Sequence, residues 1–456
     1  MQDNNPFFRR FSTQRNQSNR WRRWLGAAIG LIALAFLVYN IPFVHDRLAW
    51  RIDDLRSQID LFFNPPLQSV FIPEQNQAAI ASATAAALTP VATRTSLAAS
   101  ATPLPTEGPI PLSASLTGFK YIDQYGGWNL CGPATLAMAL TYWGWNGTRA
   151  DVEDYVKPGL ADTNLDRVAR GKPDKNVMPY ELEDFVDTQV PGLQAVERVG
   201  GDLERIKRFI AAGFPVIVEK GSYCNPGPTW CGHYLYVTGY DDAKQEFTVQ
   251  DVYLKTGADG TGKNLTAPYD EFLAQWRAFN YLFFVIYPED RLNEVIKLLG
   301  PWNDEQWANV HALEIAVAES TTLTGDAQFF AWFNVGSSHV RLYEYVDASF
   351  AYDYAFQLYA GLPADEKQPF RMMWYQTGPY WAYYYSGRYN DVINLANTTL
   401  TAMQEPTLEE SLYWRGLARL ALGETDNAIA DLQEAVRINP NFWAGWQQLE
   451  ALGISG

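Results

Sequence analysis

The pattern of hydrophobic and polar positions along this 456-residue chain changes character several times. A stretch of 21 residues, from Trp24 to Val44, carries no charge and a single amide, Asn40, and is long enough to predict a transmembrane helix over 24–44. After it, apolar residues at spacings of three and four predict a juxtamembrane helix over 45–66, which Pro65 and Pro66 end. This helix either extends the membrane span or lies at an interface with a second copy or the membrane surface.

Residues 67–114 are rich in Ala, Ser, Thr and Pro and nearly free of charge, which predicts a linker without a core of its own. From residue 115 to 290 the hydrophobic period alternates between helical and extended. A helical run follows Cys131, and a second helix is predicted around 200–213. Short apolar runs suited to strands follow at 216–218, 233–240, 247–251 and 281–288. A leading helix followed by antiparallel strands predicts an α+β domain over 115–290.

Helical periodicity alone continues over 295–456, which predicts an all-α domain. Small and apolar residues fall at the relative positions of the tetratricopeptide consensus, namely Gly416, Gly423, Ala428, Leu432, Ala435 and Pro440. Two weaker copies are marked by Gly387, Val392 and Ala396, and by Gly336, Ala348 and Ala355. Three repeats are about the minimum for a stable stack. The alternative is a set of ordinary helical hairpins ahead of one repeat.

The distribution of charge predicts how the chain is oriented across the membrane. Six arginines and only one acid, Asp3, precede the apolar run, so residues 1–23 are predicted to be a basic tail in the cytoplasm, with the C-terminal domains outside. A cleaved signal peptide is the alternative, but the run is longer than the usual ~7–15 residues and ends without a clear cleavage site. The whole chain has a net charge of −16, and without the six arginines and one aspartate of the basic tail the remainder carries 29 basic and 50 acidic side chains, a charge of −21, which argues against nucleic acid as a partner.

Cys131 is the first residue that carries a chemical prediction. Cys131-Gly132-Pro133 opens an apolar helical run, and proline is well tolerated in the first turn of a helix. The free N–H groups and the positive end of the helix dipole favour a thiolate there, and the thiolate is the nucleophilic form. The alternative is a small buried cysteine without reactivity.

A nucleophilic cysteine needs a base, and His233 is the candidate among four histidines. His45 adjoins the predicted span, whereas His311 and His339 fall in the helical region. His233 opens a predicted strand, where its ring could face the start of the Cys131 helix. Asp251, at the end of the next strand, could accept the other imidazole N–H and fix the tautomer, and Gln124 could donate to an oxyanion.

The segments around these residues resemble a known family. The stretches DQYGGWNLCGPATLAMAL, GHYLYVTGY and VQDVY are similar to cysteine peptidase family 39, the bacteriocin-processing double-glycine peptidases, and especially to its freestanding members without a transporter. The resemblance implies a papain-like fold, with the nucleophile at Cys131, the base at His233, the orienting acid at Asp251 and the oxyanion donor at Gln124. No ATP-binding transporter accompanies the domain, so leader-peptide substrates are not implied.

The two remaining cysteines, Cys224 and Cys231, bracket a short loop just before His233 that looks like an insertion. Outside the cytoplasm this pair predicts a disulfide, which leaves Cys131 unpaired. A metal site built from both cysteines and His233 would lack a fourth ligand and would remove the base.

The sequence therefore predicts a membrane-anchored, extracytoplasmic cysteine peptidase that cleaves peptide or isopeptide bonds without a metal or organic cofactor. The helical repeats are expected to bind a protein partner. One alternative is a catalytically silent scaffold that binds peptides, and another is a transpeptidase, because the same thioester intermediate serves both water and amine acceptors.

Overall fold

The computed structural model describes residues 17–41, 44, 48, 52, 55, 71–73, 108–127, 129–159, 176–224, 229–362, 371–403 and 407–454. Its first helix is α1 (Gln17–Tyr39), and the apolar side chains of this helix from Trp24 onward are exposed. Across the described residues, none of the helices combines the length and the apolar character that a bilayer crossing requires. The transmembrane helix predicted over 24–44 is therefore not confirmed, and residues 42 and 43 lie outside the described part. The juxtamembrane helix predicted over 45–66 falls almost entirely outside it.

An antiparallel sheet of seven strands organises the first globular part, in the order β2-β7-β3-β4-β5-β6, with β1 paired to β4. The strands are β1 (Ser113–Ser115), β2 (Leu193–Arg198), β3 (Val216–Cys224), β4 (Thr229–Asp241), β5 (Glu246–Gln250), β6 (Leu265–Pro268) and β7 (Phe283–Pro288). All four predicted strands are present, and the α+β class is confirmed. The sheet already begins at Ser113, inside the segment that the sequence predicted as linker.

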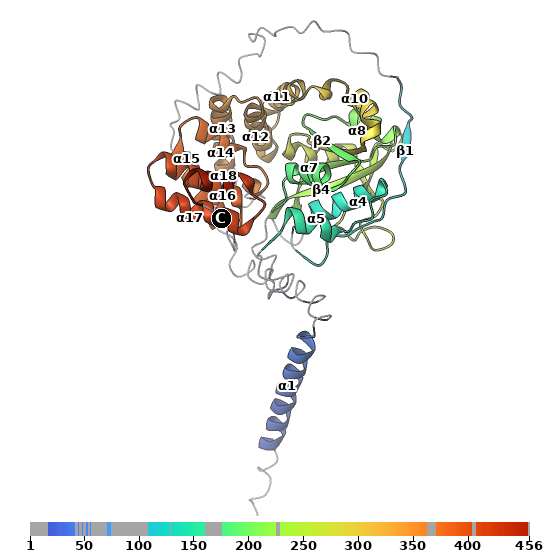
Figure 1. Cartoon of the computed structure of the whole chain (residues 1–456). Helices are drawn as coiled ribbons and strands as arrows, with labels where there is room; N and C mark the ends of the chain where they lie inside the picture. Colours follow the sequence, from blue (N-terminus) through green and yellow to red (C-terminus); the bar gives the residue numbers. More distant parts are fainter. Residues whose placement is uncertain are drawn as a thin grey trace, which may run out of the picture.

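Helices cover both faces of this sheet (Figure 1). One face carries α4 (Cys131–Tyr142), α5 (Arg149–Val156) and α7 (Pro179–Gln189), and the other carries α8 (Leu203–Ala211), α9 (Tyr269–Trp276) and α10 (Leu292–Leu299). Side chains alternate between the faces, because successive residues of a strand point in opposite directions. On β3, Ile217 joins the core under α4 and α7, whereas its neighbour Val218 joins the core under α8 and α9.

The C-terminal part is helical throughout its described residues. Its helices are α11 (Glu305–Thr322), α12 (Gly325–Arg341), α13 (Tyr345–Gly361), α14 (Gly378–Tyr385), α15 (Tyr389–Thr401), α16 (Glu409–Ala421), α17 (Thr425–Ile438) and α18 (Trp443–Ala451). Gly336 and Gly416 lie where neighbouring helices touch. A Cβ at Gly336 would come within 2.7 Å of the Tyr352 ring, and one at Gly416 within 3.1 Å of Leu432. These small residues therefore allow the helix pairs to pack closely.

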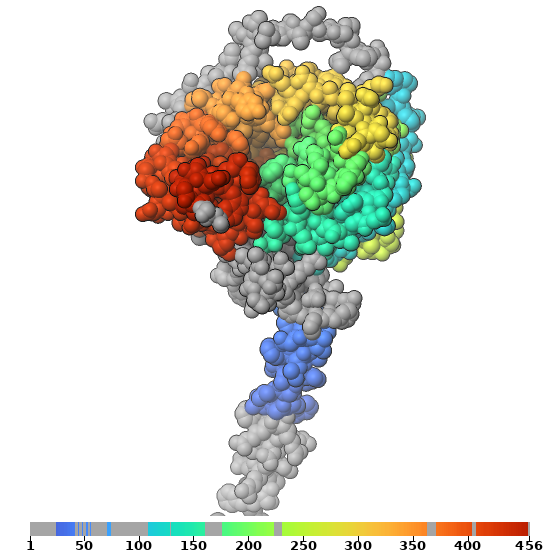
Figure 2. All heavy atoms as spheres, viewed as in Figure 1, coloured from blue at the N-terminus to red at the C-terminus, as the bar shows by residue number. Residues whose placement is uncertain are grey.

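The two parts share one hydrophobic core, and they lie directly against each other in the space-filling view (Figure 2). Trp230 on β4 stacks on Phe279, with ring centroids 5.9 Å apart and planes 16° apart, and both rings belong to the same cluster as the helices α11 to α16. Tyr375, just before α14, meets Trp230 edge to face at 5.7 Å. Phe71, from the segment predicted as linker, is buried in this cluster against Phe356.

Candidate active site

Cys131 is the first residue of α4, as the sequence predicted. The preceding residue, Leu130, offers no side-chain cap, so the N–H groups of the first turn remain available to the thiol. Cys131 is a free cysteine and is partly exposed. This position gives the sulfur both the helix dipole and access to solvent.

Gly132 determines how closely the start of α4 approaches the sheet. A Cβ at this position would lie 3.3 Å from the Tyr234 ring and 3.3 Å from Val177, which is tighter than ordinary van der Waals contact. Thr135, one turn further along α4, donates its hydroxyl to the carbonyl of Tyr234. The glycine thus lets α4 lie on β4 beside the residue that follows His233.

His233 links the cysteine to an acid. Its Nε2 lies 3.1 Å from Oδ1 of Asp251, and the ring is close enough to the Cys131 thiol for the two groups to interact electrostatically. With Nε2 directed at Asp251, Nδ1 is the nitrogen that serves the thiol. The structure therefore brings Cys131, His233 and Asp251 together in the predicted order.

The electrostatics of these three residues favour a Cys131 thiolate beside a His233 imidazolium. Burial raises the pKa of the Cys131 thiol, but the hydrogen bond and the charge of His233 outweigh it and hold that pKa below its usual 9.0. Burial lowers the pKa of His233, but the charge and hydrogen bond of Asp251 outweigh this and raise it from 6.5 to about 9. Burial raises the pKa of Asp251, yet imidazolium and backbone donors hold it well below its usual range.

Gln124 lies in a loop that is tied to the Asp251 turn. Its backbone N–H donates to the carbonyl of Val252 at 3.0 Å, and the Tyr121 hydroxyl donates to the carbonyl of Asp251 at 2.8 Å. Among the described residues, the side-chain oxygen of Gln124 is buried without a hydrogen-bond partner. The loop thus holds Gln124 beside the acid, with an unused polar atom on its amide.

The segment predicted as an insertion before His233 extends the β3–β4 hairpin. Gly221 pairs with Gly232, and Ser222 pairs with Cys231. Cys231 is disulfide-bonded, whereas the side chain of its predicted partner, Cys224, lies outside the described side chains. Trp230 on this extension enters the core shared with the helices.

Three residues near the site carry no motif that could have revealed them in the sequence. Lys220 pairs across the sheet with His233, and its charge favours the ionised form of Asp251. Glu219 is 2% exposed and close enough to Cys131 for the two groups to interact electrostatically. Tyr375, from the helical part, packs its ring against Gly232, where an added Cβ would come within 2.7 Å.

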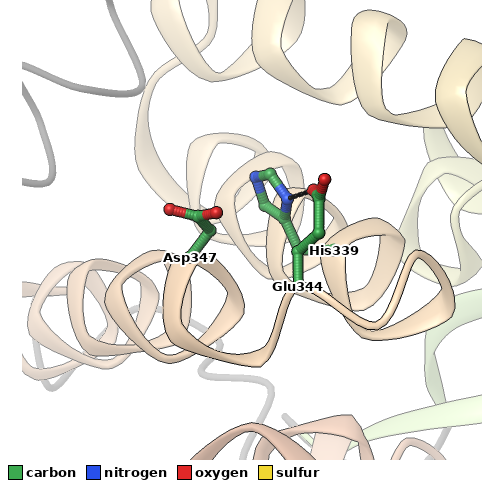
Figure 3. A group of neighbouring side chains, drawn as sticks. All are labelled: His339, Glu344 and Asp347. Atoms are coloured by element: carbon green, nitrogen blue, oxygen red, sulfur yellow. Dashed lines mark hydrogen bonds and ion pairs between the residues drawn. The ribbon is translucent and has the colours of Figure 1, made fainter.

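One group of side chains in the helical part has the composition of a metal site. Ligand atoms of His339, Glu344 and Asp347 lie within 4.8 Å of one another, and Figure 3 shows the imidazole between the two acids. Nδ1 of His339 lies 2.7 Å from the Glu344 carboxylate, and the Glu344 N–H donates to the His339 carbonyl. These contacts close the end of α12, and Asp347 is exposed. The group is accounted for as a hydrogen-bonded helix end.

A cysteine at a helix start, facing histidine and aspartate on an antiparallel sheet, defines the papain-like class of cysteine peptidase domains. Residues 116–283 match the Peptidase_C39 like family, and residues 409–442 match the tetratricopeptide repeat. The family resemblance predicted from the sequence is thus confirmed for these two segments. A search of curated proteins found no match.

Two solved structures are similar to the chain. A putative C39-like peptidase from Bacillus anthracis is 17% identical, with a TM-score of 0.29, and the match covers 39% of this chain and 98% of that one. Xylellain, a cysteine protease from Xylella fastidiosa, is 14% identical, with a TM-score of 0.27 and coverage of 48% and 91%. Similarities of this size carry no argument about activity.

Proposed function

We propose that this protein is a cysteine peptidase that hydrolyses peptide or isopeptide bonds of a protein substrate. The observation that carries the proposal is the position of His233, which interacts with the Cys131 thiol and shares a hydrogen bond with the Asp251 carboxylate. A buried histidine held in this way can take a proton from a thiol and later return it to a leaving amine.

In the proposed reaction the Cys131 thiolate attacks the scissile carbonyl carbon and forms a tetrahedral intermediate. The Cys131 backbone N–H and the Gln124 amide donate to the negative oxygen, once the Gln124 amide presents its nitrogen. The His233 imidazolium protonates the leaving amine as the C–N bond breaks. Water, deprotonated by His233, then hydrolyses the thioester and releases Cys131, while Asp251 keeps the imidazole oriented.

The helical repeats are proposed to bind part of the protein substrate or a partner that delivers it. Repeat arrays commonly present extended surfaces to peptides and proteins. A substrate held on the repeats would meet the peptidase site at a high effective concentration. The shared core around Trp230 supports a fixed relation between the two surfaces.

Anchoring through residues 24–44, with the N-terminus in the cytoplasm and the peptidase outside, is proposed from the sequence. The disulfide at Cys231 supports an oxidising, extracytoplasmic location. Protease accessibility of tags at each terminus in intact cells tests the orientation. A C-terminal tag shielded inside the cell would contradict the proposed location.

The test of the peptidase proposal is alkylation of the full-length protein with iodoacetamide across pH, with the modified residue located by mass spectrometry. An activated thiolate predicts rapid labelling of Cys131 well below pH 9, slowed by His233→Ala and absent in Cys131→Ala. Wild-type protein is also expected to cleave a denatured protein mixture, and Cys131→Ala is expected not to, which would establish peptidase activity at Cys131. Labelling no faster than that of a free thiol would favour the scaffold alternative, and ligated products would indicate transpeptidation.

A further inference from the structure

A cavity of about 410 Å³ lies between the peptidase domain and the helical repeats. The peptidase domain contributes the start of α7, the end of β2 and the middle of β3, whereas the helical part contributes residues of α11, α12, α14 and α16. This volume falls in the range of sites for small molecules or single side chains. Neither domain could form the cavity alone.

Glu219 of β3 lines this cavity and has an unusual environment. It is 2% exposed, and within the described part of the chain its carboxyl makes neither a hydrogen bond nor an ion pair. Burial, together with the neighbouring Cys131 and Glu197, raises the pKa of Glu219 well above its usual range. A buried acid without a partner is costly, and such groups often await a ligand.

The other charges around the cavity are also mainly acidic. Two arginines line it together with five glutamates, which are Glu183, Glu197, Glu219, Glu305 and Glu410. Both arginines are already engaged. Arg341 forms an ion pair with Glu197, and Arg198 donates to the backbone carbonyls of Glu197 and Trp302. Carboxyl groups therefore outnumber guanidinium groups around the cavity, and both guanidinium groups already have partners other than Glu219.

The cavity adjoins the proposed catalytic residues on two sides. Glu219 interacts electrostatically with Cys131, and the rings of Phe279 and Tyr375, which line the cavity, pack against Gly232. Gly232 immediately precedes His233. A peptide that passes the thiol could therefore direct a long side chain into this space.

We propose that the cavity is a specificity subsite for a basic side chain, lysine or arginine, of the peptide substrate, with Glu219 as its recognition acid. The inference rests on the proposed peptidase function and adds the substrate class. The incoming cation pairs with the Glu219 carboxylate, whose proton is released to solvent. The aromatic rings cover the aliphatic part of the side chain. The helical repeats thus form one wall of the substrate site.

The first experiment measures binding without turnover. Acetylated alanine pentapeptides carry lysine at each position in turn, and matched peptides carry norleucine, which has nearly the same shape without the charge. Calorimetry with full-length Cys131→Ala is expected to show, at one position, at least about tenfold tighter binding of the lysine peptide. Titrations in buffers of different ionisation enthalpy are expected to show proton release on binding.

Two glutamate variants test whether the lysine preference arises in the cavity. Glu219→Gln in the Cys131→Ala background is expected to abolish both the lysine preference and the proton release. Glu289→Gln, an exposed glutamate outside the cavity, is the matched control and is expected to keep both. Equal binding of the lysine and norleucine peptides, or a preference that survives Glu219→Gln, would overturn the proposal.

The second experiment uses the active protein. The ratio of kcat/KM for lysine over norleucine peptides is expected to be at least about tenfold in wild type and to approach one in Glu219→Gln. Alkylation of Cys131 by iodoacetamide separates the two hypotheses. A reactive Cys131 without lysine preference would refute the subsite alone, whereas an unreactive Cys131 with Glu219-dependent lysine binding would refute the peptidase alone.

Discussion

Oδ1 of Asp251 accepts from Nε2 of His233 at 3.1 Å and, at the same time, from the backbone N–H groups of Tyr253 at 2.8 Å and Leu254 at 3.0 Å. The backbone donors belong to the turn that begins at Asp251 itself. This acid is therefore fixed by its own turn before it orients the imidazole. The orientation of His233 then depends on local sequence as well as on packing.

Two substitutions of Asp251 should distinguish its role in orienting the His233 imidazole from its role in stabilising the imidazolium charge. Asp251→Ala is expected to lower kcat/KM by at least about 100-fold, because the imidazole loses the group that orients it and stabilises its charge. Asp251→Asn is the matched variant, since it keeps a side-chain oxygen while it removes the charge. It is expected to lower the pKa of His233 from about 9, which NMR titration of the imidazole would detect. An unchanged His233 titration in Asp251→Asn would contradict this account.

The pH dependence of peptide cleavage should be bell-shaped. The acid limb reports formation of the Cys131 thiolate, whose pKa lies below its usual 9.0. The alkaline limb reports loss of the proton from His233 at about pH 9, after which the leaving amine is no longer protonated. Measurement of kcat/KM from pH 4 to about 10.5 checks both limbs. A single limb rising through pH 9 would indicate an ordinary thiol.

The His233–Asp251 pair should also stabilise the fold within a defined pH window. The pKa of His233 is raised from 6.5 to about 9, so its contribution is complete below pH 6.5 and is lost as the pH rises through about 9. The pKa of Asp251 is depressed from 3.8, so its contribution is present above pH 3.8 and is lost on acidification. Urea unfolding of Cys131→Ala, with and without His233→Gln and Asp251→Asn, is therefore expected to differ most between pH 3.8 and 6.5. A difference that grows toward pH 9 would contradict it.

Gly132→Ala tests the approach of α4 to β4. The added methyl group would lie 3.3 Å from Tyr234 and Val177, so the helix start must shift away. We expect a loss of about 1–3 kcal/mol in the free energy of unfolding and slower alkylation of Cys131. Gly361→Ala is the control, because nothing lies within 4 Å of its added Cβ. Wild-type alkylation in Gly132→Ala would show that the close approach is not needed.

Trp230→Ala tests whether the two parts of the chain unfold together. The side chain is 1% exposed, and its loss should lower the free energy of unfolding by about 3–5 kcal/mol, with one transition for both domains in wild type. Trp443→Ala is the matched control, since Trp443 is 67% exposed. Two well-separated transitions in wild-type protein would contradict the shared core.

Much of the peptidase fold could be predicted because its signals are local. The apolar run at 216–218 lies in β3, and the run at 281–288 contains β7, which begins at Phe283. Cys131 begins its helix, as the proline two residues later suggested. Strand β2 was not predicted. Its sequence Leu193–Arg198 shows little alternation, because its two buried residues, Ala195 and Val196, are adjacent and face opposite sides of the sheet. This segment forms a strand because it pairs with β7 in the folded protein, and that tertiary contact is not visible in the local sequence.

The proposed triad could also be assembled from the sequence, because Cys131 begins α4 and Asp251 directly follows β5. His233 was expected to open its strand, but β4 already begins at Thr229, so His233 lies inside it. The role proposed for Glu219 could not be predicted, since a single glutamate within an apolar strand carries no pattern that reveals a cavity whose second wall comes from the helical part. The shared core escaped prediction for the same reason. Trp230 resembles any loop aromatic until its partners from the helical part are known.

The common core of Trp230, Phe279 and the repeat helices limits how the two domains can be recombined in evolution. A peptidase domain copied into another gene without its repeats would leave these rings in water and would lose one wall of its cavity. Domain shuffling that preserves this core and this cavity must therefore carry both parts at once. In evolutionary terms the peptidase and its repeats form a single module.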